Sequence, residues 1–248
     1  MTTSPPVPWT GADPYAAALR AGRGPLFLRR TDGWLLPLDV ERWCARADPV
    51  DRAVLDRCEG AVLDVGCGPG RLVAELAARG RPVLGIDVSA AAVDHTVRLG
   101  GQALRRSVFE PLPGEGRWGT VLLMDGNVGI GGDPHALLGR VARLLAPGGL
   151  LIAETAPVDV DECADVHLTD AREAVGAPFR WARLGTPALL RCARGWEPEA
   201  QWAAGGRRFA ALRSLPRSRL RSSGGTPIAS RSAEPPKSTA VISSQRAR

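Results

Sequence analysis

The sequence has almost no lysine and almost no tyrosine. Lys237 and Tyr15 are the only residues of their kinds among 248, although arginine occurs 31 times. A Tyr-x-x-x-Lys pair, which would favour a nicotinamide-dependent oxidoreductase, is therefore absent, and no catalytic histidine pattern replaces it. The replacement of lysine by arginine, with abundant Ala, Gly and Pro, suggests a bacterial genome rich in G and C.

Cysteine is scarce and scattered, and long apolar runs are missing. No two cysteines have the C-x-x-C spacing of a metal or redox site, and their number is odd; they are Cys44, Cys58, Cys67, Cys163 and Cys192. This pattern argues against a disulfide framework or a zinc site and fits a reducing cytoplasm. No run approaches the 18 apolar residues that would cross a bilayer. The first residues do not have the pattern of a secretory signal, so we expect a cytoplasmic protein without membrane contact.

The positive charge is confined to one segment. The formal net charge is +6, from 32 basic and 26 acidic residues. Residues 214–248 hold seven of the basic residues and one acid, which leaves 25 of each sign in 1–213. The same segment holds nine serines and four prolines, so we expect a disordered basic tail. A neutral folded part offers no phosphate track, and a nucleic-acid partner is not expected.

One stretch of the sequence predicts a ligand site. Residues 62–65 read as a short buried strand, Gly66, Gly68 and Gly70 follow at alternate positions, and residues after Gly70 have helical spacing. A glycine turn lets the backbone pass close to a ligand, and the helix after it aims free N–H groups at that ligand. The spacing G-x-G-x-G differs from the dinucleotide fingerprint G-x-G-x-x-G.

An acid follows the next predicted strand. Asp87 lies 21 residues after Gly66, at the end of residues 82–86, where a carboxylate can accept hydrogen bonds from both ribose hydroxyls. Together the glycine turn and the segment 85–89 resemble class I S-adenosylmethionine-dependent methyltransferases. The resemblance continues at 119–125, which is similar to the fourth strand of that family, and at 147–152, which is similar to the turn into the fifth.

The alternation of strands and helices predicts an α/β fold. The spacing of apolar residues predicts helices at 13–21, 48–57, 70–79, 89–98, 133–146 and 186–193, and strands at 61–65, 82–86, 103–107, 119–125 and 149–154. Such alternation produces a parallel sheet with helices on both faces. Segments 201–203 and 208–212 flank Gly205-Gly206, which suggests a closing hairpin. The resemblance therefore implies a Rossmann-like, doubly wound, mostly parallel seven-stranded sheet with a C-terminal antiparallel hairpin.

Three regions follow from this organisation. Residues 1–57 are expected to form a partly helical extension, in which Tyr15, Trp34, Arg42 and Trp43 either cap the substrate or belong to a core. Residues 58–213 form the cofactor-binding methyltransferase domain, and residues 214–248 form the tail.

The resemblance assigns S-adenosylmethionine as the cofactor and a set of residues to hold it. The glycines approach its methionine and ribose parts, Asp64 lies near its ammonium group, Asp87 holds the ribose, and Val88 lies against the adenine. The third strand departs from the family, because Ser107 stands where many relatives have an acid; Glu110 could substitute, but we expect it to face away. The complete implied set is Asp64, Gly66, Cys67, Gly68, Gly70, Asp87, Val88, Ser107, Val108 and Asp125.

Candidates for catalysis follow the fourth strand. Carboxyl ends of parallel strands face the ligand crevice, so the glycine-dense segment 125–134 should border the methyl-transfer site. Asp125 and Asn127 could orient an acceptor. His135 could act as a general base because histidine titrates near neutral pH, or it could be a surface residue. Asp133 followed by Pro134 reads as a helix cap.

An acidic cluster follows the fifth strand. It consists of Asp159, Asp161, Glu162, Asp165 and His167. Carboxylate oxygens suit Mg²⁺, but carboxylates in a loop are usually solvated, and we expect no metal.

The sequence therefore predicts an enzyme that transfers a methyl group from S-adenosylmethionine to a small molecule, with the acceptor atom left open. The alternatives are a nicotinamide-dependent oxidoreductase, a cofactor-binding protein without activity, and a methyltransferase directed at nucleic acid or protein. Segment 125–128 lacks the prolines and aromatic residue with which amino-methylating enzymes capture a flipped base.

Overall fold

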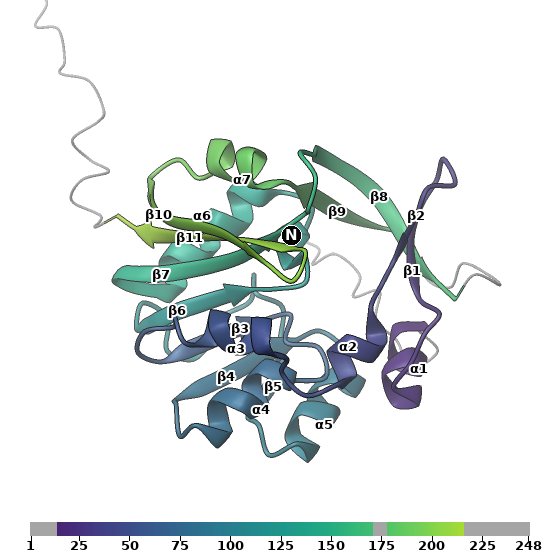
Figure 1. The fold of residues 1–248 in the computed structure, drawn as a ribbon, viewed down its shortest axis with the longest axis horizontal. Coiled ribbons are helices and arrows are strands. Elements are labelled where there is room, and N and C mark those ends of the chain that lie inside the picture. Colours follow the sequence, from purple (N-terminus) through teal and green to yellow (C-terminus); the bar gives the residue numbers. More distant parts are fainter. Residues whose placement is uncertain (1–13, 171–177, 216–248) are drawn as a thin grey trace, which may run out of the picture.

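The computed structural model describes residues 14–170 and 178–215. It contains a seven-stranded sheet and a smaller four-stranded sheet, which lie side by side (Figure 1). The predicted Rossmann-like fold is confirmed, while the second sheet was not predicted. Among the described residues no helix is long and apolar enough to span a membrane.

The large sheet has the strand order β10-β11-β7-β6-β3-β4-β5. Its first five strands along the chain pair in parallel, and β11 pairs antiparallel with both β7 and β10. The bounds are β3 Val62–Val65, β4 Val83–Asp87, β5 Ala103–Arg105, β6 Trp118–Leu123, β7 Leu145–Thr155, β10 Trp196–Ala204 and β11 Arg207–Ser214. The hairpin turns at Gly205 and Gly206, which both have positive φ, as a two-residue hairpin turn requires.

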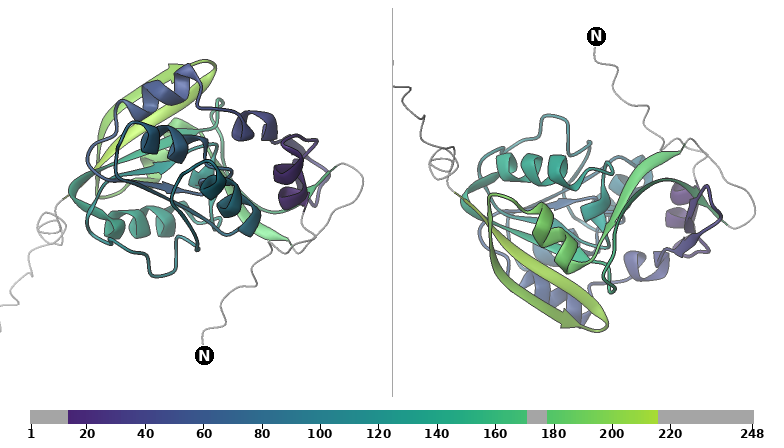
Figure 2. Two further views of the ribbon diagram at one scale, coloured as in Figure 1. Left: turned by 90° about the horizontal axis from the view of Figure 1, so that it is seen from below. Right: turned by 90° about the horizontal axis from the view of Figure 1, so that it is seen from above.

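Helices cover both faces of the large sheet (Figure 2). On one face, α3 (Pro49–Leu55) and α4 (Arg71–Ala78) pack against the sheet around Leu55, Leu72 and Ile152, and α5 (Ala90–Arg98) contacts α4. On the other face, α6 (Pro134–Leu144) and α7 (Thr186–Cys192) enclose a second core around Leu137, Leu151 and Leu189. The strands are thus buried on both sides, which explains their nearly continuous apolar runs.

Local capping signals predicted several helix starts correctly. Asp48 forms a capping box with Asp51 at the start of α3, Ser89 caps α5, and Asp133 caps α6 with Pro134 in the first turn. Asp13, the expected cap of α1 (Pro14–Ala21), lies outside the described residues. Element ends were less accurate: β7 starts four residues earlier than expected, and β5 ends two residues earlier.

The small sheet has the order β2-β1-β8-β9 and is antiparallel. Its strands are β1 Phe27–Arg30, β2 Leu35–Pro37, β8 Asp161–Thr169 and β9 Phe179–Leu184. Strand β1 pairs with β8, so that Phe27 lies opposite Thr169 across more than 130 residues of chain. With α1 and α2 (Val40–Cys44) these strands surround a third core that includes Leu19, Leu28 and Val40. We call this unit, α1, α2 and the small sheet, the cap.

Four of the five members of the acidic cluster are on a strand, and Asp159 lies in the connection before it. Asp161, Glu162, Asp165 and His167 belong to β8. For these four residues the prediction of loop carboxylates was wrong, because β8 alternates outward polar residues with an inward face and pairs with both β1 and β9. Strand β11 includes Ser214, one residue beyond the expected domain end, and residues 216–248 lie outside the described part of the chain.

Candidate functional site

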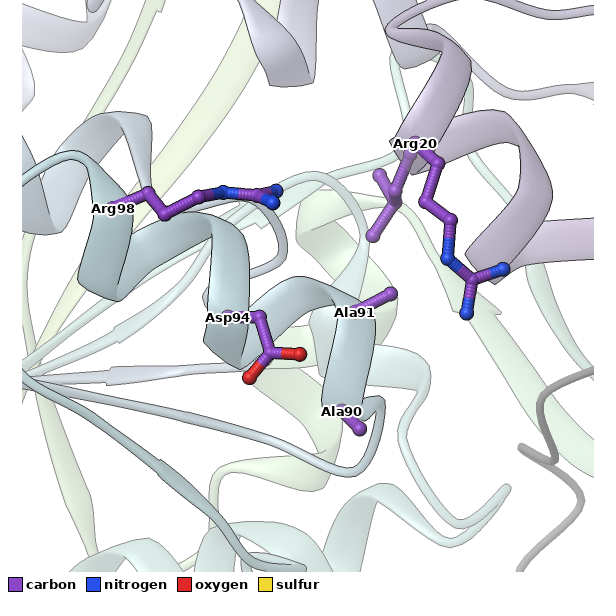
Figure 3. A pocket seen from close by; sticks show the side chains of 6 residues that line it. Arg20, Ala90, Ala91, Asp94 and Arg98 are labelled. Atoms are coloured by element: carbon purple, nitrogen blue, oxygen red, sulfur yellow. The ribbon is translucent and has the colours of Figure 1, made fainter.

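A cavity of about 1010 Å³ lies between the cap and the carboxyl ends of the parallel strands. Ligand pockets for one drug-sized molecule have volumes of about 300–1,000 Å³, so this cavity has room for a nucleoside cofactor and a second small molecule. A separate cleft of about 150 Å³ lies between α1 and α5, with Arg20 and Arg98 on its two sides (Figure 3). It is too small for a nucleoside.

The glycine turn forms one wall of the large cavity. Gly66, Cys67 and Gly68 line it, together with Pro69. Gly66 has φ 71°, and a Cβ there would lie 2.5 Å from Asn127 Nδ2. Gly70 has φ 88°, does not line the cavity, and packs against α5, since a Cβ would lie 2.6 Å from Thr96 Cγ2. Two of the glycines therefore also serve the close packing of the chain on itself.

Asp87 holds the turn and faces the cavity. Its Oδ2 accepts a hydrogen bond from Gly68 N at 3.0 Å and its Oδ1 accepts one from Ser89 N at 2.8 Å. Burial raises the pKa of Asp87 to about 6, although these backbone N–H groups act in the opposite direction. Carboxylate oxygens have further lone pairs, so Asp87 can still accept from two hydroxyls of a ligand. Val88 lines the cavity beside it.

Asp64 lies behind the turn and not on the cavity wall. The residue is 1% exposed, and its Oδ2 has no hydrogen-bond partner. Burial raises the pKa of Asp64 to about 7, although Arg71 lowers it, and Asp125 and Asp87 raise it further. A ligand cation beside the turn would favour the charged form of this carboxyl.

The segment after β5 lines the cavity as a group. Ser107, Val108, Phe109 and Glu110 all do so. Glu110 was expected to face away, but its Oε2 accepts a hydrogen bond from Ser107 N at 2.6 Å, which turns the side chain back along the cavity.

Asp125, just after β6, pairs with two arginines. Its Oδ2 lies 2.7 Å from Arg71 Nη1, its Oδ1 lies 2.7 Å from Arg42 Nη2, and its backbone N–H donates to Glu154 Oε2 at 2.9 Å. Its φ is 57°, a left-handed value that is uncommon outside glycine. Burial alone would raise the pKa of Asp125, but Arg71 and Arg42 outweigh burial and lower it. The side chain lines the cavity, yet it is poorly suited to accept a proton.

Asn127 fixes the glycine turn. Its Nδ2 donates to Val65 O and Gly66 O, both at 2.9 Å, from the short helix η1 (Asn127–Gly129). Because its amide protons are used in this way, the side chain positions the turn and leaves only its oxygen for a ligand.

The two histidine candidates do not reach the cavity wall. His135 lies on the first turn of α6, exposed, and His167 on β8 is half-buried; neither is among the residues that line the cavity. The acidic cluster is used in ion pairs: Asp161 pairs with Arg191, Glu162 with Arg30 and Arg183. In the described part of the chain, no three metal-ligating side chains come together.

Sequence reasoning missed a buried ionic network beneath the cavity. Arg71 Nε donates to Asp51 Oδ2 at 2.8 Å, and Arg207 donates to Asp51 Oδ1 and to both oxygens of Glu154 at 2.7–2.9 Å. Burial alone would raise the pKa of Asp51, but Arg71 and Arg207 lower it to about 2. With Arg71 bonded to Asp125 as well, the network joins α3, α4, the turn after β6, β7 and β11. Glu154, an acid that ends an apolar strand, was the signal that could have revealed it.

The cap supplies the remaining wall. Tyr15, Arg42 and Trp43 line the cavity, whereas Trp34 lies under the guanidinium groups of Arg30 and Arg183. A Cβ on Gly68 would lie 3.4 Å from Tyr15 Oη, so α1 reaches the glycine turn. Burial raises the pKa of Tyr15 well above its usual value, with smaller contributions from Asp87 and Cys67.

Fold and site together define a nucleotide-binding α/β protein whose ligand lies at the carboxyl ends of parallel strands. A family model described as a methyltransferase domain matches residues 39–202. The chain therefore belongs to the methyltransferase family, and the resemblance seen in the sequence is confirmed.

Individual relatives agree with the family. The chain is 34% identical over 119 residues to a ubiquinone biosynthesis O-methyltransferase of Dechloromonas aromatica (strain RCB), a match that covers 44% of this chain and 50% of the relative. The chain thus spans half the length of that protein. In structure it is similar to an S-adenosylmethionine-dependent methyltransferase from Bacteroides fragilis in complex with S-adenosylhomocysteine, with a TM-score of 0.70, 22% identity and coverage of 87% and 98%.

A second solved structure has the same fold at lower similarity. It is the CcbJ methyltransferase from Streptomyces caelestis, with a TM-score of 0.52, 17% identity and coverage of 67% of this chain and 88% of the other. At these identities the two structures establish the fold, which is that of S-adenosylmethionine-dependent methyltransferases.

Proposed function

We propose that the protein transfers a methyl group from S-adenosylmethionine to a small-molecule acceptor. The observation that carries the proposal is the pairing of the glycine turn with Asp87 on the wall of a cavity large enough for cofactor and acceptor. The family match favours this function over a nicotinamide-dependent oxidoreductase. The D. aromatica relative is named for a small-molecule pathway, which supports a small acceptor.

The residues fit the cofactor chemically. Asp87 would hold the ribose hydroxyls, and Ser107 with Val108 would border the adenine. Gly66 to Gly68 would lie along the ribose and methionine parts, because no side chain projects from either glycine there. Asp64 would offset the positive charge of the ligand from behind the turn. When bound, the cofactor supplies a methyl group that is already strongly electrophilic.

The protein then has to align the acceptor with that methyl group. Among the described residues that line the cavity there is no histidine or lysine, and each carboxylate there has a partner. Arginines pair with Asp39, Asp125 and Glu154. Backbone N–H groups donate to Asp87 and Glu110. Alignment and exclusion of water by the cap are therefore the contributions of this chain. The free cysteines, among them buried Cys58 and Cys67, support a reducing cytoplasmic setting.

Calorimetry with S-adenosylhomocysteine tests the proposal directly. The wild type should bind it, and Asp87→Ala should weaken binding by about 1–3 kcal/mol through loss of charge-assisted hydrogen bonds. Asp94→Ala, at an exposed acid on α5 outside the large cavity, is the matched control and should bind as the wild type does. Absence of wild-type binding at millimolar ligand would refute the function.

A further inference from the structure

The cap wall of the cavity is mainly apolar. Leu28 pairs across the sheet with Leu36 on β2 and with Leu168 on β8, so the three side chains share one face of the small sheet. All three line the cavity, and Phe179 and Trp181 on β9 extend the same wall. This face and the glycine turn line the same cavity.

Aromatic residues are concentrated at this cavity. The chain has twelve aromatic residues, seven Trp, four Phe and one Tyr. Eleven of them belong to the described residues, and five of these eleven line the cavity; the five are Tyr15, Trp43, Phe109, Phe179 and Trp181, all but Phe109 in the cap. Aromatic rings offer large flat surfaces that favour offset stacking or edge contacts with another ring. Nearly half of the aromatic residues in the described part of the chain thus surround one cavity.

The charged side chains of the cap wall are already paired. Arg42 is bound to Asp39 at 3.1 Å and to Asp125 at 2.7 Å. Arg183 is bound to Glu162 at 2.8 Å and lies 4.9 Å above the Trp34 ring. A charged acceptor that lies against the cap wall would have to break one of these partly buried pairs, and the group left behind would be uncompensated. An uncharged acceptor avoids this cost.

Trp181 is held where the cap wall meets the strand ends. It forms a β-bridge with Ile130, which follows η1, and it packs edge-on against Phe179 with ring centroids 6.1 Å apart. Gly129 makes this approach possible, because a Cβ there would lie 2.7 Å from Trp181 Nε1. The glycine at position 129 therefore lets the Trp181 indole pack directly against the segment after β6 that borders the cavity.

We propose that the acceptor is a small, uncharged aromatic molecule whose ring lies against Trp181 on the cap wall. This deepens the proposed function and rests on it. Trp181 is then a specificity-determining residue, and the saturated counterpart of a good ligand should be a poor one, because its puckered ring cannot lie flat on the indole.

Calorimetry with two ring probes tests the acceptor class. The protein is first saturated with S-adenosylhomocysteine and then titrated with 2-naphthol or with decahydro-2-naphthol, which share a carbon skeleton and one hydroxyl. We expect 2-naphthol to bind at least about tenfold more tightly, the ratio that corresponds to 1.4 kcal/mol. Trp181→Leu keeps apolar bulk and should remove most of this preference. Trp202→Leu is the matched control and should keep the wild-type ratio, because Trp202 stacks on Phe209 in the hairpin, outside the cavity.

The outcomes separate the two proposals. Binding of S-adenosylhomocysteine with equal affinities for the two probes would overturn the acceptor class and leave the methyltransferase function standing. The acceptor class is overturned in the same way if Trp181→Leu binds S-adenosylhomocysteine normally and keeps the wild-type ratio. Failure of the wild type to bind S-adenosylhomocysteine would refute the function. Titration of the two probes into the free protein would still test whether the cap wall prefers an aromatic ring. The wild-type comparison requires no variant to fold.

Discussion

Arg71 and Asp51 form a bidentate ion pair in the interior, with Nε–Oδ2 at 2.8 Å and Nη2–Oδ1 at 3.2 Å. Arg71 is the residue directly after the glycine turn, and Asp51 has no exposed surface. Asp51 lies on α3, before the strand and glycine turn that identify the family in the sequence. The pair therefore attaches the helix that starts at the cofactor turn to a segment that the sequence motif does not include.

Loss of Arg71 should destabilise the fold strongly. In Arg71→Met, the buried carboxylates of Asp51 and Asp125 lose a shared partner, and removal of one member of a buried pair costs about 3–5 kcal/mol. Arg79→Met is the control, because Arg79 pairs with Asp56 and Glu75 near the surface, where pairs contribute about 0–1 kcal/mol. Urea unfolding of both variants measures the difference; equal losses would show that the network is not a stabilising feature.

Asp125 should act by position and not as a general base. Asn tolerates left-handed φ and keeps one oxygen for Arg71, so Asp125→Asn should retain a folded protein and lower kcat by less than about tenfold. Removal of a general base would cost about 10²–10⁴-fold. The pH profile of kcat, measured with an acceptor that the wild type methylates, distinguishes the two roles. If the wild-type kcat falls at low pH and the variant loses this fall, Asp125 is the base after all.

The pH dependence of stability should reveal Asp64. Its pKa in the folded protein is raised to about 7 from an ordinary value of 3.8, so the folded state binds more protons than the unfolded state between these values. Stability contributed by this group therefore falls as pH rises from about 4 to 7.

Asp64→Asn removes this titration. The free energy of unfolding of the variant relative to the wild type should increase by about 2–3 kcal/mol between pH 5 and pH 8, from the 1.36 kcal/mol that corresponds to one pKa unit. Comparison of the two proteins at both pH values cancels any constant effect of the amide. An unchanged difference would mean that Asp64 ionises normally inside the fold.

Gly129 should not tolerate a side chain. Gly129→Ala would place Cβ against Ala182 O and the Trp181 indole, and such overpacking typically costs about 1–3 kcal/mol. Gly139→Ala is the matched control, because Gly139 lies in α6 and a Cβ added there would have no atom within 4 Å, and alanine in a helix is favoured by about 1 kcal/mol. In urea unfolding, Gly129→Ala should lower the free energy of unfolding and Gly139→Ala should raise it. Stabilisation by both substitutions would contradict the close packing of η1 on β9.

Much of the large sheet could be predicted because its signals are local. Apolar strands, the positive-φ glycines and the caps Asp48, Ser89 and Asp133 each act within a few residues of chain. Asp87 could be placed at the cavity for the same reason, since a strand end is visible in sequence. Sequence alone could not place the side chains of His135 and Glu110 relative to the cavity. The direction of a side chain at a helix start or in a turn depends on the residues that pack around it.

The sequence by itself determined the parallel sheet, the glycine turn and the family, since short-range patterns and their spacing define these features. Only the tertiary structure decided the cap and the ionic network. Strand β8 is charged on its outward face, and its place inside the small sheet depends on β1, which pairs with its second edge from more than 130 residues away. The ionic network likewise joins three separate segments of the chain, which contribute Asp51, Asp125 and Arg207. These residues come together because a buried charge is stable only beside a charge of opposite sign.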